Sequence, residues 1–303
     1  MTLRRFLRNA LLILGAVVLL LGCFAGGLYL YYHPTFTRLD SVVYGKRNGE
    51  DLTFDVVTPA KPKGIGVILM VSGGWKSGRD SFRPWMVASL LRRGYTVFAV
   101  SHVSQPKATV MGIYEDVSRA VRTIRHDAAR YGVDPNRLGV TGGSAGGHLS
   151  LMVATRGGPG PSGAADPIDK ESSAVQAVAI FYPVTDLLNL GASTENMGDG
   201  GPPRSFIQAF GPDSTNLAVW KVIGRDMSPI FHIHSNLPPT LILHGGADTL
   251  TPPDQSTRYQ AAAQGMGNVV ELSIHPGGKH GWLTMVFDVH RFAKWFDRYL
   301  AAH

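Results

Sequence analysis

The chain has 303 residues, of which 44% are hydrophobic and 17% are charged, and it carries a formal net charge of +7. This composition excludes a largely disordered chain and fits one large α/β domain whose well-buried core is joined by many tight turns. Arg4, Arg5 and Arg8 supply part of the positive charge, and the remainder is dispersed without the basic runs typical of nucleic-acid binding. We therefore expect one folded domain over residues 37–303, preceded by a separate segment over residues 1–36, and no nucleic-acid partner.

The first segment contains a long uncharged stretch. No charged residue occurs from Ala10 to Tyr32, and a helix of that length, rising about 1.5 Å per residue, spans the roughly 30 Å hydrocarbon core of a bilayer. The arginines that precede it predict a cytoplasmic N-terminus and a periplasmic or extracellular domain. Two alternatives stay open: a cleaved secretory signal, and a lipoprotein signal, because Leu20-Leu21-Gly22-Cys23 resembles a lipobox that would place a lipid on Cys23.

The next elements are strand-like. Residues 41–44 and 52–58 are rich in β-formers and flank a turn-rich stretch, which predicts an antiparallel hairpin. After Pro59 the pattern changes to near-continuous apolar runs, which are typical of strands buried on both faces of a parallel sheet. These runs cover residues 66–71, 96–100, 138–141, 174–181 and 240–243.

Helical patterns separate these runs. Apolar residues recur at three- and four-residue spacing from Ile113 to Ala128, and Gly132 is predicted to end that helix. A last helix is expected over residues 287–300. Strands alternating with helices predict a mostly parallel central sheet flanked by helices. Residues 157–173 and 187–235 break the alternation, and we expect the second to form a cap or lid over the functional site.

Ser144 is the candidate nucleophile. It lies within Gly142-Gly143-Ser144-Ala145-Gly146-Gly147, directly after the strand-like residues 138–141 and before the helix-like residues 148–155. A G-x-S-x-G pattern alone is weak evidence in so glycine-rich a chain. A nucleophile elbow, however, needs small residues on both sides of a serine at a sharp strand-to-helix turn. That context is present here.

A serine nucleophile requires a base and an acid farther along, in the order Ser, Asp, His. Asp248 follows the apolar residues 241–243, and His280 lies in a glycine-flanked loop after the strand-like residues 270–275. Loops that follow parallel strands meet at the carboxyl edge of the sheet, where ligands bind. We therefore predict a Ser144–His280–Asp248 triad. Asp186, which follows the run ending at residue 181, is the rival acid.

An oxyanion hole needs backbone N–H groups near the nucleophile. Ala145, the residue after the serine, is the first expected donor, and the loop Ser72-Gly73-Gly74-Trp75 after an early strand should supply Gly73 and Gly74. The histidines and carboxylates show no metal-ligand spacing and no phosphate-binding loop occurs, so neither a metal nor a cofactor is expected.

Residues 67–78, 116–149, 241–252 and 277–282 resemble α/β-hydrolase carboxylesterases, closest to the BD-FAE (feruloyl esterase-like) and hormone-sensitive-lipase-like group. The resemblance implies an α/β-hydrolase fold and a serine esterase that cleaves small-molecule or carbohydrate esters through an acyl-enzyme. These families usually carry His-Gly-Gly-Gly in the oxyanion loop, whereas this chain has no histidine there. Gly73 and Gly74 are the donors if Trp75 matches the family's tryptophan; Gly74 and Trp75 are the donors if Ser72 replaces the histidine.

Two other functions remain open. One is a serine peptidase similar to the prolyl oligopeptidase family, although that family usually has an additional β-propeller for which 303 residues leave no room. The other is a catalytically silent hydrolase fold used for binding, against which the presence of all three triad residues argues.

Overall fold

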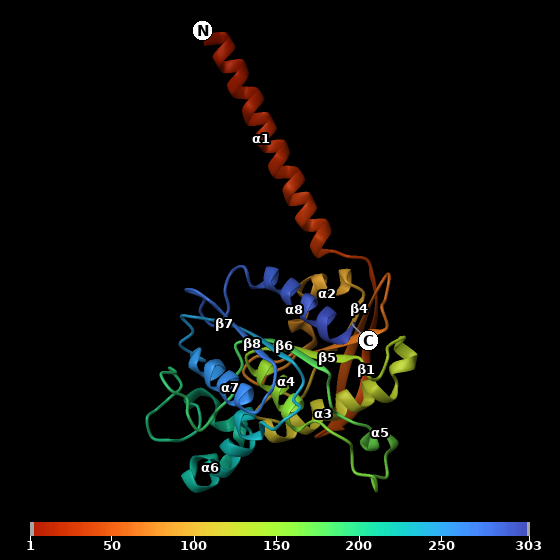
Figure 1. Cartoon of the computed structure of the whole chain (residues 1–303), viewed down its shortest axis with the longest axis vertical. Coiled ribbons are helices and arrows are strands. Elements are labelled where there is room, and N and C mark those ends of the chain that lie inside the picture. The colour runs from red at the N-terminus through yellow and green to blue at the C-terminus, as the bar shows by residue number, and fades with distance from the viewer. Residues whose placement is uncertain (1–2, 302–303) are drawn as a thin grey trace.

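A computed structural model of the protein describes residues 3–301 as one long N-terminal helix followed by a sheet covered by helices on both faces (Figure 1). Within these residues the sheet has eight strands in the order β1-β2-β4-β3-β5-β6-β7-β8. Their bounds are β1 Phe36–Arg47, β2 Glu50–Pro59, β3 Ile65–Met70, β4 Tyr95–Val100, β5 Leu138–Gly143, β6 Ala177–Phe181, β7 Thr240–Gly245 and β8 Val270–His275.

The strand directions follow the sequence patterns. β1 and β2 form the predicted antiparallel hairpin, and β2 also pairs antiparallel with β4. All further pairs, from β4 to β8, are parallel. Every residue of β4 and β6 is buried, which explains their uninterrupted apolar runs, because helices cover both faces of the sheet there. The predicted mostly parallel sheet is confirmed.

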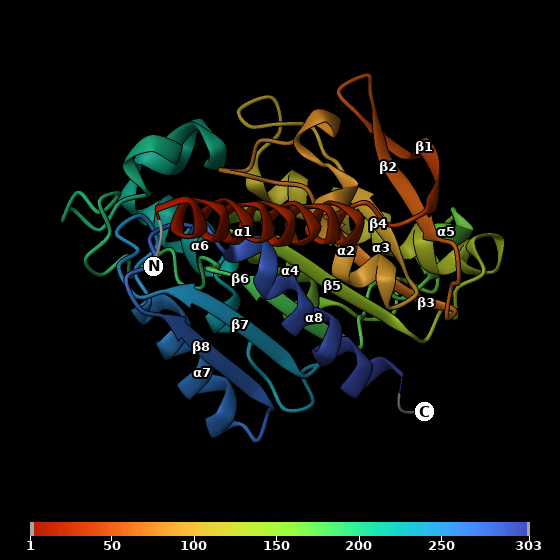
Figure 2. The same ribbon diagram turned by 90° about the horizontal axis from the view of Figure 1, so that it is seen from above.

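The helices form one layer on each face. On one face, α2 (Ala88–Arg92) and α8 (Met285–Leu300) pack with a core cluster that contains Leu90 and Phe292. On the other face, α3 (Val110–His126), α4 (Ala145–Arg156) and α7 (Asp254–Gly265) pack with a second cluster. Figures 1 and 2 place α2 and α8 on the side of the sheet from which α1 rises.

The end of α3 differs from its prediction. The α-helix stops at His126, and a separate 3-10 turn, Ala128–Tyr131, follows it. Gly132, with a left-handed φ of 63°, ends this turn rather than the helix. The apolar spacing was misleading because Ala128 is buried like the helical residues before it, although its backbone is no longer α-helical. The last helix, α8, begins two residues earlier than expected.

Residues 187–235 contain short helices instead of a strand: η4 Arg204–Phe210, η5 Pro212–Thr215, α6 Leu217–Asp226 and η6 Pro229–His232. We call residues 187–235 the cap, since several of them line the candidate site described below. The other irregular segment, residues 157–173, carries α5 (Pro167–Lys170). It is tied to α3 by Arg119, whose guanidinium lies 2.6 Å from Asp166 and 2.5 Å from Asp169.

The N-terminal helix α1 (Leu3–Tyr32) stands away from the domain except at its last turn. There the Tyr31 hydroxyl lies 3.0 Å from Ser89 Oγ, Arg92 Nε donates to Tyr31 O at 2.6 Å, and the rings of Tyr32 and Phe287 are 5.8 Å apart. The helical segment Leu7–Tyr32 is long and apolar enough to cross a membrane, and a signal sequence can have the same length and composition. The helix is therefore consistent with a membrane or a secreted protein.

Candidate active site

Ser144 occupies a strained turn between β5 and α4. Its φ of 54° and ψ of −121° are unusual for a residue with a side chain, and such backbone strain is characteristic of functional sites. The neighbouring glycines are required by close approach: a Cβ at Gly142 would lie 2.5 Å from the Gly146 carbonyl carbon, and one at Gly146 would lie 2.5 Å from Met70 O. The predicted elbow, with small residues around the serine, therefore has a steric cause.

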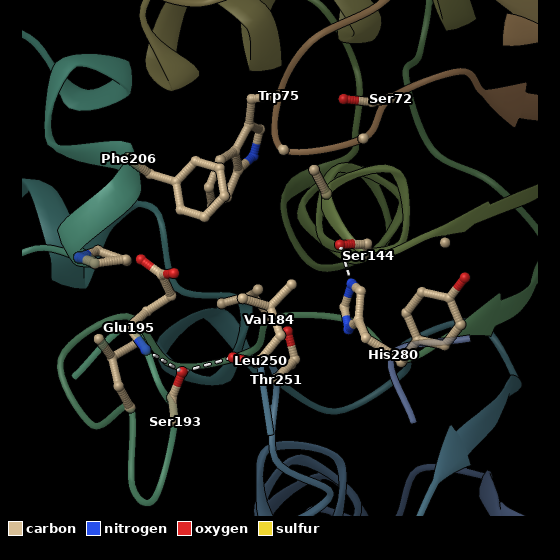
Figure 3. A pocket seen from close by; sticks show the side chains of 17 residues that line it. Ser72, Trp75, Ser144, Val184, Ser193, Glu195, Phe206, Leu250, Thr251 and His280 are labelled. Atoms are coloured by element: carbon tan, nitrogen blue, oxygen red, sulfur yellow. Dashed lines mark hydrogen bonds between the residues drawn. The ribbon is translucent and has the colours of Figure 1, made fainter. Parts of the chain in front are cut away.

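The structure brings Ser144, His280 and Asp248 together. Ser144 Oγ lies 2.8 Å from His280 Nε2 (Figure 3). On the other side of the ring, His280 Nδ1 lies 2.8 Å from Asp248 Oδ2. Asp248 follows β7 and His280 follows β8, and these neighbouring parallel strands place both loops at one edge of the sheet. With Nδ1 protonated, His280 donates to Asp248 and accepts from the serine hydroxyl, which is the arrangement that activates a serine.

Asp248 is buried, and its carboxylate accepts several hydrogen bonds from the protein. Its Oδ1 accepts from the N–H groups of Leu250 and Thr251 at 3.0 and 2.9 Å. Burial alone would raise the pKa of Asp248, but hydrogen bonds from His244, His280 and the Thr251 N–H outweigh it and hold the pKa well below its usual range. The contact between His244 and Asp248 is the longer one: His244 Nε2 lies 3.5 Å from Asp248 Oδ2 and 2.8 Å from Thr251 O. Asp248 is therefore ionised at neutral pH.

The rival acid, Asp186, belongs to another network. Its Oδ1 accepts from the N–H groups of Leu188 and Asn189, both at 3.0 Å. Its Oδ2 receives a 2.5 Å hydrogen bond from Arg258. Asp186 therefore ties the start of the cap to α7, while Asp248 is the carboxylate that contacts His280.

One backbone N–H of the oxyanion loop, residues 72–75, already donates a hydrogen bond within the protein. Gly73 N–H donates to Lys76 O at 2.9 Å, and Gly146 N–H donates to Ser72 O at 3.1 Å, which ties the loop to the start of α4. Within residues 3–301 the N–H groups of Gly74 and Trp75 have no hydrogen-bond partner. Of the two registers expected from the sequence, this geometry favours the one with Gly74 and Trp75, because Gly73 is engaged elsewhere.

His102 is a site residue that sequence reasoning missed. Its Nε2 accepts from Ser72 Oγ at 2.9 Å and its Nδ1 donates to Val103 O at 2.9 Å. Burial lowers the pKa of His102 to about 4, so the ring is neutral at pH 7. A usable signal existed: Met70 and Val100 pair in β3 and β4, so Ser72 and His102 each lie two residues beyond paired positions. A histidine thus contacts the oxyanion loop from the adjacent strand.

His148, in α4, is fully buried. Its Nε2 donates to Met227 O at 2.7 Å, and its Nδ1 accepts from Trp75 Nε1 at 3.2 Å. Burial lowers the pKa of His148 to about 4. The neutral ring therefore connects α4 to the oxyanion loop and to the segment that follows α6.

A cavity of about 350 Å³ opens above Ser144 and His280, within the size range of ligand pockets. Figure 3 shows Phe206 and Trp75 on one side of it, with Val184 and Leu250 facing Ser144 and His280. Glu195, a cap residue in the lining, accepts hydrogen bonds from the backbone and hydroxyl of Ser205. Among residues 3–301 no group of three His, Cys, Asp or Glu side chains is placed to hold a metal ion.

Comparisons with known proteins identify the family of this chain. The BD-FAE family model matches residues 54–262. Esterase LipQ of Mycobacterium tuberculosis is 32% identical over 227 residues, covering 71% of this chain and 50% of its own length. Isoprenylcysteine alpha-carbonyl methylesterase ICME of Arabidopsis thaliana is 25% identical and covers 91% of this chain and 64% of its own length. This chain therefore spans about half to two thirds of these relatives.

Solved structures share the fold. Esterase 2 of Thermogutta terrifontis superposes with a TM-score of 0.68 at 26% identity, covering 85% of this chain and 91% of that one. A truncated carbohydrate esterase from gut microbiota superposes with a TM-score of 0.72 at 22% identity, covering 86% of this chain and 96% of that one.

Proposed function

Because this chain belongs to the BD-FAE family of α/β-hydrolases, we propose that it is a serine hydrolase that cleaves carboxylic esters with Ser144, His280 and Asp248. The observation that carries the proposal is the continuous hydrogen-bonded relay, with 2.8 Å between Ser144 Oγ and His280 Nε2 and 2.8 Å between His280 Nδ1 and Asp248 Oδ2. The strained backbone of Ser144 and the apolar cavity above it support the same assignment.

The proposed reaction proceeds through an acyl-enzyme. His280 removes the proton of Ser144 Oγ as the oxygen attacks the ester carbonyl, and Asp248 stabilises the imidazolium that forms. The N–H groups of Gly74 and Ala145 stabilise the tetrahedral oxyanion, with Trp75 N–H as the further donor on the loop side. His280 then returns the proton to the leaving alcohol, and a water molecule activated by the same histidine releases the acid. No cofactor takes part in these steps.

We propose a small-molecule ester as the substrate class, with acylated carbohydrate as one member to test. The apolar side chains of Val184, Leu190 and Phe206 in the cavity support an organic acyl or alcohol group over a highly charged one. The relatives named as esterase and methylesterase support ester over amide substrates. A panel of nitrophenyl esters, acetylated sugars and aminoacyl amides measures this choice directly.

The decisive experiment is labelling with a fluorophosphonate, which reacts with activated serines. The wild-type protein should be labelled and should hydrolyse p-nitrophenyl acetate, and Ser144→Ala should lose both properties. Labelling that persists in the purified mutant would exclude Ser144 as the nucleophile. An unlabelled wild type without esterase or peptidase activity would instead indicate a silent hydrolase fold used for binding.

We further propose that α1 is a retained membrane anchor and that the catalytic domain lies on the extracytoplasmic side. Residues 24–32 stay apolar after Cys23, whereas a lipoprotein normally turns polar after its lipidated cysteine. The arginines before the span support the orientation. The full-length protein should stay in the membrane fraction after a high-salt wash, and Cys23→Ala should leave this unchanged. Release of that variant would favour the lipoprotein alternative.

A further inference from the structure

A second cavity lies beside the active site on the face that carries α1. It measures about 540 Å³ and lies between the sheet, α8 and the short helical segment formed by η2 (Pro84–Val87) and α2. Its walls are mainly apolar, and they include Phe82, Leu90, Val286, Val289 and Phe292. The reaction proposed above leaves this space unused.

The second cavity adjoins the first. Ser72, Gly73, Gly143 and Tyr182 line both of them. These residues belong to the oxyanion loop and to the ends of β5 and β6, and Gly143 directly precedes the proposed nucleophile. An acyl group held at Ser144 therefore lies next to an apolar space whose volume falls in the range of ligand pockets.

The second cavity is lined by residues of α2 and α8, the helices that the last turn of α1 contacts, and we call its exposed lining residues its mouth. The cavity-lining residues Trp85 and Met86 remain 43% and 38% exposed. Leu283, two residues before α8, and Phe287, in its first turn, are 99% and 45% exposed. Phe287 also packs against Tyr32, the last residue of α1. An aromatic and apolar rim at the end of a membrane-spanning helix would lie at the bilayer interface.

We propose that this second cavity binds the long acyl chain of a membrane-derived lipid ester, which enters from the bilayer while its ester group reaches Ser144. The inference rests on the ester hydrolysis proposed above and names its substrate class. The chain belongs to the acyl side because the leaving alcohol oxygen must face His280 Nε2, and His280 lines the first cavity but not the second. An apolar cavity on the membrane face is otherwise costly to leave to water.

The first test compares chain lengths in the full-length protein reconstituted in phosphatidylcholine nanodiscs. Each additional CH2 that leaves water strengthens binding on the order of fourfold, so kcat/KM should rise at least tenfold from p-nitrophenyl butyrate to p-nitrophenyl decanoate. Val286→Trp, which fills the cavity from α8, should lower the decanoate-to-butyrate ratio at least tenfold. The kcat/KM for decyl acetate, whose long chain is on the alcohol side, should change much less in Val286→Trp.

Two further variants secure the result. Ser81→Trp fills the cavity from an exposed position on the opposite wall, so it tests the same space if Val286→Trp fails to fold. Val222→Trp, the same change at a 70% exposed position of α6, is the matched control and should leave the ratio at the wild-type value. Unchanged ratios in both cavity variants would overturn the inference, as would loss of decyl acetate hydrolysis with decanoate hydrolysis retained.

The second test needs no activity. Brominated phosphatidylcholine in the nanodisc should quench the protein's tryptophan fluorescence, and Trp85→Phe should remove a measurable part of that quenching. Equal quenching in the wild type and this variant would show that the mouth does not lie at the bilayer. The proposed function itself fails separately, by the absence of butyrate hydrolysis and of Ser144 labelling in the wild type.

Discussion

Replacing Asp248 with asparagine removes one charge and changes the direction of one hydrogen bond. The Asp248 Oδ1 accepts from the N–H groups of Leu250 and Thr251, and an asparagine oxygen can keep both contacts. The new amide nitrogen then takes the position of Oδ2, 2.8 Å from His280 Nδ1. Because this nitrogen donates, His280 Nδ1 must become the acceptor and the ring proton moves to Nε2. That tautomer cannot accept the proton of Ser144.

The expected loss follows from this tautomer. An acid-to-amide change of this kind lowers kcat by about 10³ to 10⁴ in serine hydrolases, which corresponds to ~4–5.5 kcal/mol in the activation barrier. The KM for p-nitrophenyl acetate should change much less, because Asp248 does not line the first cavity. Steady-state kinetics on the full-length protein, with circular dichroism as the folding check, measures both parameters.

Asp186→Asn is the matched control. It makes the same chemical change on a buried aspartate, but it removes the 2.5 Å hydrogen bond from Arg258 instead of the contact to His280. We expect kcat within about threefold of wild type and a loss of ~1–3 kcal/mol in the free energy of unfolding, typical of a lost charged hydrogen bond. If Asp186→Asn lost 10³ in kcat while Asp248→Asn stayed within tenfold, and both were folded, the triad acid would have to be reassigned.

Three further outcomes are expected. His102→Ala should lower kcat about tenfold with little change in KM, because a single positioning hydrogen bond is worth ~1–1.5 kcal/mol, and His102→Gln should recover part of the loss in the same assay. Burial lowers the pKa of His102 and of His148 from 6.5 to about 4, so between pH 4 and 6.5 the unfolded chain binds more protons than the folded one. The free energy of unfolding should therefore be highest above pH 6.5 and fall toward pH 4 by up to ~1.4 kcal/mol per pH unit for each histidine. A flat profile in pH-dependent denaturation would contradict this. Gly142→Ala should cost at least ~3 kcal/mol and most activity, because its Cβ would overlap the Gly146 backbone at 2.5 Å; native thermal stability in this variant would refute the steric argument.

Local patterns predicted most of the fold. Apolar runs located each strand from β3 to β7 within a few residues, because a strand buried on both faces must be apolar throughout. The position of Ser144 between a strand and a helix predicted the elbow, and chain order predicted which loops would carry Asp248 and His280. Apolar spacing was a poorer guide to the end of α3, since burial at Ala128 continues after the α-helical backbone has ended.

Contacts between distant segments required the tertiary structure. The sequence predicted Asp248 as the acid with Asp186 as its rival, and the structure adds the contacts of each: Asp248 meets His280 and Asp186 meets Arg258. The donor register of the oxyanion loop depends on a hydrogen bond from Gly73 to Lys76 O, and the His102 contact depends on the pairing of β3 with β4. A sequence pattern reports each residue's own burial and backbone preference, but a hydrogen bond or a cavity wall is shared by residues far apart in the chain. The three residues of the predicted triad were therefore visible in the sequence, whereas the hydrogen bonds of the oxyanion loop, the His102 contact and the second cavity depend on packing.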